Sequence, residues 1–291
     1  MAYESSALAL SSPAHPRGHI VDTLIAERAP KLAASRAWSF IKPLLYLALD
    51  YRSARRMADS IAPLSGLEAL ETVSRLLALE IEVRGLECVP RHGRLMVVCN
   101  HPTGIADGVA VWDVLKTVRR DTVFYANSDA HRVAAGFRDL LIPVEWMDEK
   151  RTRHGARMTL VRTREVMEAE RPLVVFPAGR LARKRPGRPL RDPPWASSVF
   201  SLARKYDAPV LPLHIAGPWS SLFHLFDRFN GELRDITLFH ELLNKRGRRF
   251  RILIGRPAPA TTLPSDAGEA ARAMKAFVEE TLPPTATWRV R

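Results

Sequence analysis

Short apolar runs alternate with longer helix-like segments along most of the chain. Segments that are apolar, bounded by turn residues and of strand length lie at 80–85, 95–99, 122–126, 140–145, 173–176, 209–215 and 250–255. Helix-length segments separate several of these runs, at 107–120, 152–169 and 195–206. Strands that alternate with helices predict an α/β fold with a mostly parallel or mixed central sheet flanked by helices.

The two ends of the chain predict different kinds of structure. Residues 1–20 are rich in Ala, Ser and Pro and predict a disordered tail. Residues 21–79 predict a helical region, in which apolar residues between 66 and 80 recur at helical spacing. The stretch 266–282 predicts a final helix docked on the sheet. We therefore expect one α/β domain over 80–291, preceded by a helical extension.

One N-terminal stretch, AWSFIKPLLYLAL from Ala37 to Leu49, is apolar and carries aromatic residues between basic flanks. Lys42 and Pro43 interrupt it, and no run of about 18 apolar residues occurs, so we expect no spanning helix. Two interpretations stay open. The stretch suits an anchor lying in a membrane interface, and it equally suits a buried helix with solvated ends.

Charge narrows the kinds of partner. The chain has 44 Lys and Arg against 31 Asp and Glu, a net charge of +13. This excess favours an anionic partner: nucleic acid, an anionic membrane surface, coenzyme A or an acidic carrier protein. Aromatic residues are not interleaved with the basic runs, and no known nucleic-acid-binding motif occurs, which disfavours nucleic acid.

Cysteine and histidine usage disfavours a disulfide scaffold and a metal site. Cys88 and Cys99 are the only cysteines and form no C-x-x-C pair. The nine histidines lack metal-ligand spacing, and the zinc-protease-like start His240-Glu241 is followed by Asn244 where a second histidine is needed. We also find no secretory signal. We therefore expect no cofactor and a cytoplasmic setting.

The most informative stretch is Asn100 to Asp107, which follows the apolar run 95–99. It places His101 and Asp107 near the carboxyl end of a predicted strand, where ligands usually bind in α/β sheets. Alone, the histidine suits a hydrogen-bonded turn residue better than a catalyst, and the aspartate suits a helix N-cap. A second apolar strand followed by a Pro/Gly turn, Val174 to Arg180, predicts that two strand ends form one site.

The string NHPTGIADG resembles the lysophospholipid acyltransferase superfamily, which includes the glycerolphosphate acyltransferases. The common signature has four residues between histidine and aspartate, whereas five separate His101 from Asp107. Proline after the histidine and glycine after the aspartate are similar to the hemolysin-like, ornithine-lipid acyltransferase-like branch. The resemblance continues, in order, through 83–90, 140–145, 174–179, 210–217 and 250–257.

This resemblance implies transfer of a fatty acyl group from acyl-CoA or acyl carrier protein to a hydroxyl of a lysophospholipid-like or lyso-aminolipid acceptor. His101 would be the general base and Asp107 would orient its ring. Backbone amides around Gly104 or at the following helix start would bind the oxyanion. The substrate-binding residues that it implies are Asn100, Gly104, Phe176, Pro177, Gly179, Arg180, Arg183 and Lys184.

The third motif departs from the usual F-P-E-G-T-R pattern. Ala178 replaces the glutamate, and Arg180 stands one position early, where it suits a displaced phosphate or a carboxylate. From Arg180 to Arg191 the chain carries six cations and no acid, which suits coenzyme A phosphates, an acidic carrier or lipid headgroups, or else a solvated loop.

Two other functions stay open: a thioester or ester hydrolase that uses the same His/Asp pair, and a non-enzymatic basic protein that binds membranes or nucleic acid. We expect an acyltransferase bound peripherally to the cytoplasmic face of the inner membrane, with an anionic membrane surface and a lipid acceptor as partners and without nucleic acid.

Overall fold

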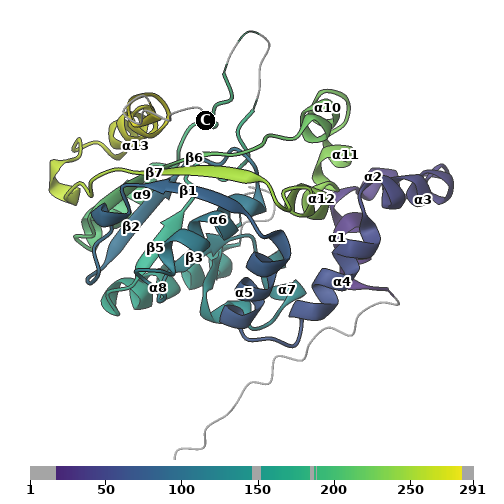
Figure 1. Cartoon of the computed structure of the whole chain (residues 1–291), viewed down its shortest axis with the longest axis horizontal. Coiled ribbons are helices and arrows are strands. Elements are labelled where there is room, and N and C mark those ends of the chain that lie inside the picture. Colours follow the sequence, from purple (N-terminus) through teal and green to yellow (C-terminus); the bar gives the residue numbers. More distant parts are fainter. Residues whose placement is uncertain (1–17, 146–151, 184–186, 188, 284–291) are drawn as a thin grey trace, which may run out of the picture.

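A seven-stranded sheet forms the centre of the computed structural model (Figure 1). The structure describes residues 18–145, 152–183, 187 and 189–283. The strand order is β1-β7-β6-β2-β5-β3-β4. The strands are β1 (Glu80–Arg84), β2 (Leu95–Cys99), β3 (Val123–Ala126), β4 (Leu141–Pro143), β5 (Pro172–Val175), β6 (Val210–Ala216) and β7 (Arg249–Ile254). Each lies within two residues of a predicted strand.

The sheet is mixed, because β6 and β7 pair antiparallel while every other neighbouring pair is parallel. Strand β2 lies in the middle, between its parallel neighbours β5 and β6, and is fully buried. The prediction of an α/β fold with a mixed sheet flanked by helices is therefore confirmed.

Helices cover both faces of the sheet, and side chains of β2 alternate between them as strand geometry requires. Val97 and Cys99 belong to one apolar core, and Met96 and Val98 to the other. The helices over the first core are α1 (Ile20–Arg28), α4 (Tyr51–Ile61), α5 (Gly66–Leu77), α6 (Ile105–Leu115) and α12 (Leu238–Leu243). Those over the second are α8 (Arg153–Glu168), α9 (Ser198–Lys205) and α13 (Ala267–Ala276).

Five further helices lie in the described ranges: α2 (Pro30–Ala33), α3 (Trp38–Ala48), α7 (Asp129–Val133), α10 (Ser221–Phe229) and α11 (Gly231–Asp235). Single 3-10 turns lie at Leu86–Cys88, Phe137–Asp139 and Ala260–Thr262, and a π-helical turn at Phe277–Thr281 follows α13. The sequence analysis assigned no element to the segment that forms α10, α11 and α12. Of the predicted tail, residues 1–17 lie outside the described residues, and Ile20 already begins α1.

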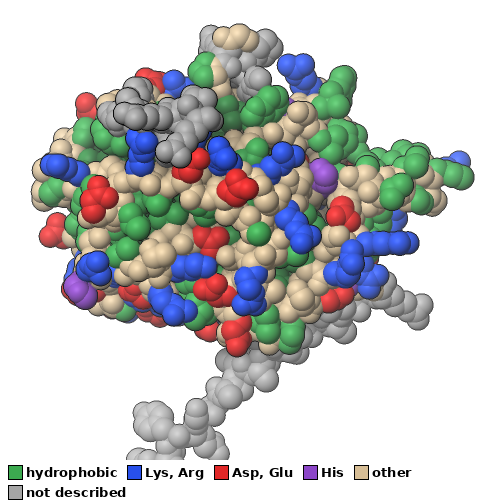
Figure 2. All heavy atoms as spheres, in the orientation of Figure 1, with side chains coloured by type: hydrophobic (Ala, Val, Ile, Leu, Met, Phe, Trp, Pro, Cys, Tyr) green, Lys and Arg blue, Asp and Glu red, His purple; other side chains and the backbone are tan. Residues whose placement is uncertain are grey.

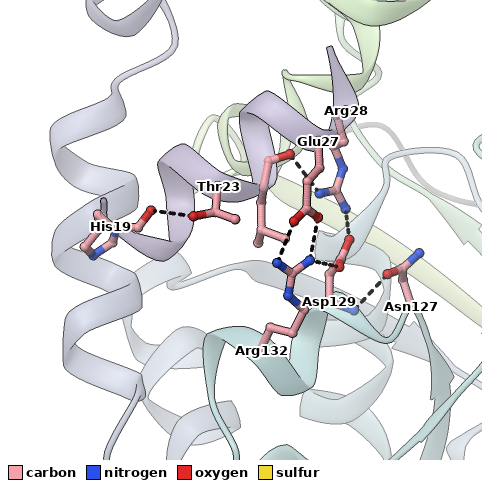
Figure 3. A network of polar contacts seen from close by, with 8 residues as sticks. His19, Thr23, Glu27, Arg28, Asn127, Asp129 and Arg132 are labelled. Atoms are coloured by element: carbon pink, nitrogen blue, oxygen red, sulfur yellow. Dashed lines mark hydrogen bonds and ion pairs between the residues drawn. The ribbon is translucent and has the colours of Figure 1, made fainter. Parts of the chain in front are cut away.

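Helix α1 joins the N-terminal helices to the rest of the molecule. Its Val21 and Leu24 are buried in the first core. On its polar side, Arg132 of α7 donates two hydrogen bonds to Glu27, at 2.6 and 2.8 Å, and Arg28 donates to Asp129 at 2.6 Å (Figure 3). Apolar burial and ion pairs thus hold α1 against the α/β core.

Helix α3 extends away from the sheet (Figure 1), and none of its residues is buried. The side that faces the protein is mixed: Trp38 and Leu45 pack against the first core, Tyr46 donates to Asp22 at 2.8 Å, and the Nζ atom of Lys42 lies 3.4 Å from the same carboxylate. Its apolar side faces outward.

Candidate active site

The two sequence motifs meet at one edge of the sheet. His101 follows β2 and Phe176 follows β5, and because these neighbouring strands are parallel, their carboxyl ends lie side by side. The imidazole of His101 lies against the ring of Phe176, with centroids 4.4 Å apart and planes tilted by 31°. The structure thus brings together the two strand ends that the sequence predicted to form one site.

His101 and Asp107 form a hydrogen bond, with 2.9 Å between Nδ1 and Oδ2. The side chain of Asp107 is 0 % exposed and that of His101 is 17 % exposed. Since an ionised carboxylate only accepts hydrogen bonds, Nδ1 carries the proton and Nε2 presents a lone pair. Within the described ranges no hydrogen bond to Nε2 occurs. The pair therefore has the tautomer and the access that a general base requires.

Asp107 is a helix cap and the histidine's partner at once. It is the third residue of α6, and its Oδ2 accepts from the backbone amides of Thr103 (2.9 Å) and Gly104 (3.1 Å). The Thr103 hydroxyl donates to Oδ1 at 2.5 Å. The sequence analysis overlooked Thr103. The two readings of Asp107, as cap or as catalytic partner, are compatible, because one carboxylate serves both.

Glycine at position 104 is required by the turn between β2 and α6. Gly104 has φ +98°, a conformation that L side chains rarely adopt. A Cβ atom there would also lie 3.3 Å from the side chain of Leu181. Gly104 thus lets the turn fold tightly under the segment that follows the second motif.

The second motif turns sharply after β5. The amide of Gly179, at φ +63°, donates to the carbonyl of Phe176 at 3.0 Å, and the carbonyl of Pro177 accepts from Ala196 at 2.9 Å. Phe176 and Pro177 are buried, whereas Arg180 is exposed. Its guanidinium forms no ion pair with any described residue, so this cation at the end of the motif is available to an anionic ligand.

Two other predicted substrate-binding residues are engaged within the protein. The Asn100 side chain donates to the carbonyl of Ile215 and accepts from its amide, at 2.9 and 2.7 Å, which ties the end of β2 to β6. Arg183 lies 3.3 Å from Asp227 of α10. In this structure both residues support the site's walls, with their polar groups already paired. Lys184 lies outside the described residues.

Asp192 is the main residue at this edge that the sequence analysis overlooked. Its Oδ1 accepts from the backbone amide of His101 at 3.0 Å, and its Oδ2 from the indole of Trp195 at 2.9 Å. Burial raises the pKa of Asp192 to about 6, against the lowering effect of these two hydrogen bonds. One signal was present in the sequence: Asp192 is the first acid after the run of six cations.

The geometry corrects one expectation about oxyanion binding. The amides of Thr103 and Gly104 already donate to Asp107, so the turn around Gly104 does not offer them to a ligand. At the start of α6 the amides of Ile105 and Ala106 have no hydrogen-bond acceptor among the residues described. They are therefore the backbone donors of this turn that have no partner in the described part of the chain.

A metal ion has no evident place in the described part of the chain, where no three His, Cys, Asp or Glu side chains converge on one point. Among the same residues, no helix has the length and apolar character needed to cross a bilayer.

Part of the chain is similar in sequence to known acyltransferases. Residues 80–216 match a family model described as Acyltransferase. The chain is 28% identical over 205 residues to a lyso-glycine lipid O-acyltransferase of Phocaeicola vulgatus, covering 68% of this chain and 71% of that protein. It is 27% identical to a protein of the same name from Bacteroides thetaiotaomicron, covering 68% and 72%. A crystal structure of the 1-acyl-sn-glycerophosphate acyltransferase PlsC from Thermotoga maritima aligns with a TM-score of 0.49 at 14% identity, over 94% of this chain and 99% of that one.

Proposed function

Because the chain belongs to the glycerolphosphate/lysophospholipid acyltransferase superfamily and is an acyltransferase with a lipid-like acceptor, we propose that His101 is its general base. The acyl donor in this proposal is a thioester, acyl-CoA or acyl carrier protein, which serves as co-substrate without a further cofactor. The observation that carries the proposal is the 2.9 Å bond from His101 Nδ1 to the buried Asp107, which leaves Nε2 free.

The reaction needs a single proton carrier. Nε2 of His101 takes the proton of the acceptor hydroxyl while the oxygen attacks the thioester carbonyl carbon. The C–S bond of the tetrahedral intermediate then breaks, and the leaving thiolate takes the proton back from Nε2. An ester and a free thiol result, and the enzyme ends unchanged. Asp107 stabilises the imidazolium between these steps, and the amides of Ile105 and Ala106 are the oxyanion donors that we propose.

For the acceptor we propose a lyso-lipid whose headgroup carries a carboxylate. Arg180 supports this, because its guanidinium has no ion-pair partner among the described residues and follows Gly179 at the active edge, and a planar fork binds a carboxylate through two hydrogen bonds. The two relatives named as lyso-glycine lipid O-acyltransferases point the same way, since an amino acid joined to a lipid through its nitrogen presents a carboxylate.

We further propose that α3 lies in the interface of a cytoplasmic membrane face. Phe40, Leu44 and Leu47 form one stripe along the helix and are 81, 70 and 82 % exposed. Hydrophobic side chains gather over α3 in Figure 2, at the end of the molecule where this helix extends outward. The net charge of +13 favours anionic lipids. Of the two interpretations of this stretch, the exposed stripe supports the interfacial anchor.

The test is an assay of the purified full chain with acyl-CoA and, separately, acyl carrier protein as donor. Each donor is offered with a lyso-lipid carrying a carboxylate headgroup, with lysophosphatidic acid, and with no acceptor. We expect acylation of the carboxylate lipid and donor consumption only when an acceptor is present. Equal donor consumption without acceptor would identify a hydrolase, and preference for lysophosphatidic acid would overturn the acceptor assignment.

A further inference from the structure

His101 is held on both sides of its backbone by the segment that follows the second motif. Its amide donates to Asp192 at 3.0 Å, and its carbonyl accepts from the amide of Ala182 at 2.8 Å. The backbones of Arg183 and Arg191 form an antiparallel β-bridge at the base of this segment. The position of the proposed base therefore depends on Asp192 as well as on Asp107.

Asp192 is a buried acid without a cation of its own. It is 6 % exposed, and the donors to its carboxylate are neutral groups, the His101 amide and the Trp195 indole. No ion pair of Asp192 with any Lys or Arg occurs among the residues described. Nearby Lys275 and Arg191 instead contact Glu279, at 2.5 and 3.5 Å. A buried carboxylate without a counter-charge is costly, so its position needs an explanation.

Glu279 fixes Asp192 from the other side. Its Oε1 accepts from the backbone amide of Asp192 at 2.8 Å, and its side chain is 6 % exposed. Because Glu279 lies in the π-helical turn after α13, the end of the chain's last helix is linked through Asp192 to His101. This chain of contacts leaves Asp192 little freedom to turn toward solvent.

A cation that can balance the charge of Asp192 forms during the proposed reaction, when the imidazole of His101 takes a proton. We propose that Asp192 is a positioning residue that fixes the backbone of His101 and stabilises its imidazolium, as a second carboxylate beside Asp107. This inference rests on the proposed role of His101 as base. It explains why the resting protein keeps a buried charge next to neutral donors: the charge acts on a cation that exists only within the catalytic cycle.

Removing the charge without removing the hydrogen bond is the sharpest test. In Asp192→Asn alone, the amide NH₂ would face the Trp195 indole N–H, so one donor would oppose another. The double variant Asp192→Asn/Trp195→Phe avoids this conflict, because the asparagine oxygen still accepts from His101. It differs from the single variant Trp195→Phe only in the charge at position 192, and these two proteins form the comparison.

The first readout is the pKa of His101, followed by NMR in the full chain and assigned by the signal lost in His101→Gln. Loss of the nearby negative charge destabilises the imidazolium, so we expect the pKa of His101 to be about one unit lower in the double variant than in Trp195→Phe. We also expect kcat to be about tenfold lower, with the acidic limb of the kcat/KM profile moved to lower pH. The other titratable groups around this edge stay the same in both proteins: Asp107, Glu279, Arg191, Lys275, His214 and Cys99.

Asp113→Asn is the matched control, because it removes one charge from α6 six residues beyond Asp107. It should leave the pKa of His101 unchanged. Equal pKa values of His101 in Trp195→Phe and the double variant would overturn the inference, even if activity fell, because a packing role alone lowers activity without moving this pKa.

A reciprocal measurement leaves position 192 unchanged and so does not depend on how that variant folds. Coupling between two titrating groups is mutual, so the pKa of Asp192 should be higher in His101→Gln than in the wild type by a similar amount. An unchanged Asp192 pKa would contradict the proposal. These titrations need no turnover. Coupling without any acyl transfer by the wild type would therefore reject the proposed function while the link between the two residues stands.

Discussion

The edge of the sheet that carries His101, called the catalytic edge below, and helix α3 place their polar and apolar side chains differently. At the edge, buried polar groups are matched inside the protein: the carboxylate of Asp107 accepts from His101, Thr103 and Gly104. In α3, Lys42 and Tyr46 contact Asp22 on the side that also packs against the core, whereas the apolar side chains Leu44 and Leu47 face out. The first arrangement fixes a reactive group. The second leaves apolar surface uncovered, and this is the surface that we propose for the membrane contact.

The two regions should therefore be separable by mutation. If the catalytic edge carries out acyl transfer and α3 binds the membrane, substitutions at the edge should lower turnover without releasing the protein from vesicles. Substitutions on α3 should do the reverse. Deleting the N-terminal region is a poor test of this division, because Val21, Leu24 and Met57 are part of the core.

The largest effect is expected from His101→Ala. Loss of the base should lower kcat about 10³-fold or more, because no other described group offers an unprotonated nitrogen at this position. The assay is initial-rate acyl transfer, with vesicle co-sedimentation measured on the same sample. Binding to vesicles should match the wild type. A variant that is folded and fully active would reject His101 as base.

Asp107→Asn should lower kcat about 10²-fold. The amide can turn its NH₂ toward Nδ1, which favours the wrong tautomer of His101, and the helix start loses a negative charge. Since Asp107 also caps α6, the thermal midpoint should fall by a few degrees. The control is Asp113→Asn on the same helix, for which kcat should stay within about twofold. Equal loss of activity in both variants would show that the charge acts non-specifically.

On α3, the triple variant Phe40→Ser/Leu44→Ser/Leu47→Ser should weaken binding to anionic vesicles by about tenfold or more, because three exposed apolar side chains are lost from the interface. Activity on detergent-solubilised acceptor should stay near the wild-type value. The matched control is Leu160→Ser, an exposed leucine on α8 that is 51 % exposed. Equal binding of the triple variant and the control would remove α3 from the membrane contact.

The elements of the fold also differ in how well the sequence predicted them. Apolar strands such as β2 were located to the residue, because a buried strand between turns leaves a strong pattern. Helix α6 begins two residues earlier than expected, since Asp107 caps it from its first turn. The segment that forms α10 to α12 was not predicted as helical; these helices are short, and α10 and α11 bury none of their residues.

The pairing of His101 with Asp107 was expected on the sequence resemblance, whereas the role of Asp192 was not visible. Asp192 lies 91 residues from His101 along the chain, and it contacts the histidine's backbone. Such a contact depends on how β2 and the segment after β5 lie together, which no local pattern encodes. For the same reason, sequence could not tell that Asn100 is engaged by Ile215.

Arg180→Gln tests whether acceptor binding and the chemical step depend on different residues of the catalytic edge. Removing the guanidinium should raise KM for a carboxylate acceptor about tenfold and change kcat little, since about 1.4 kcal/mol corresponds to tenfold. Arg183→Gln is the control, because Arg183 already pairs with Asp227 and should affect KM less. If the acceptor KM values of the two variants were equal, Arg180 would have no special role at this edge.

The smallest effect is expected from Arg132→Met, which removes the ion pair of α7 with Glu27 of α1 and leaves the second link between these helices, from Arg28 to Asp129, in place (Figure 3). Arg132 and Glu27 are 38 and 45 % exposed, so water screens their attraction, and the free energy of unfolding should fall by less than about 1 kcal/mol. Arg164→Met on α8, whose pair with Glu168 spans 3.6 Å at greater exposure, should change it less still. Urea unfolding of both variants measures the difference. A loss of several kcal/mol in Arg132→Met would mean that ion pairs, rather than the buried Val21 and Leu24, hold α1 and the helices beyond it in place.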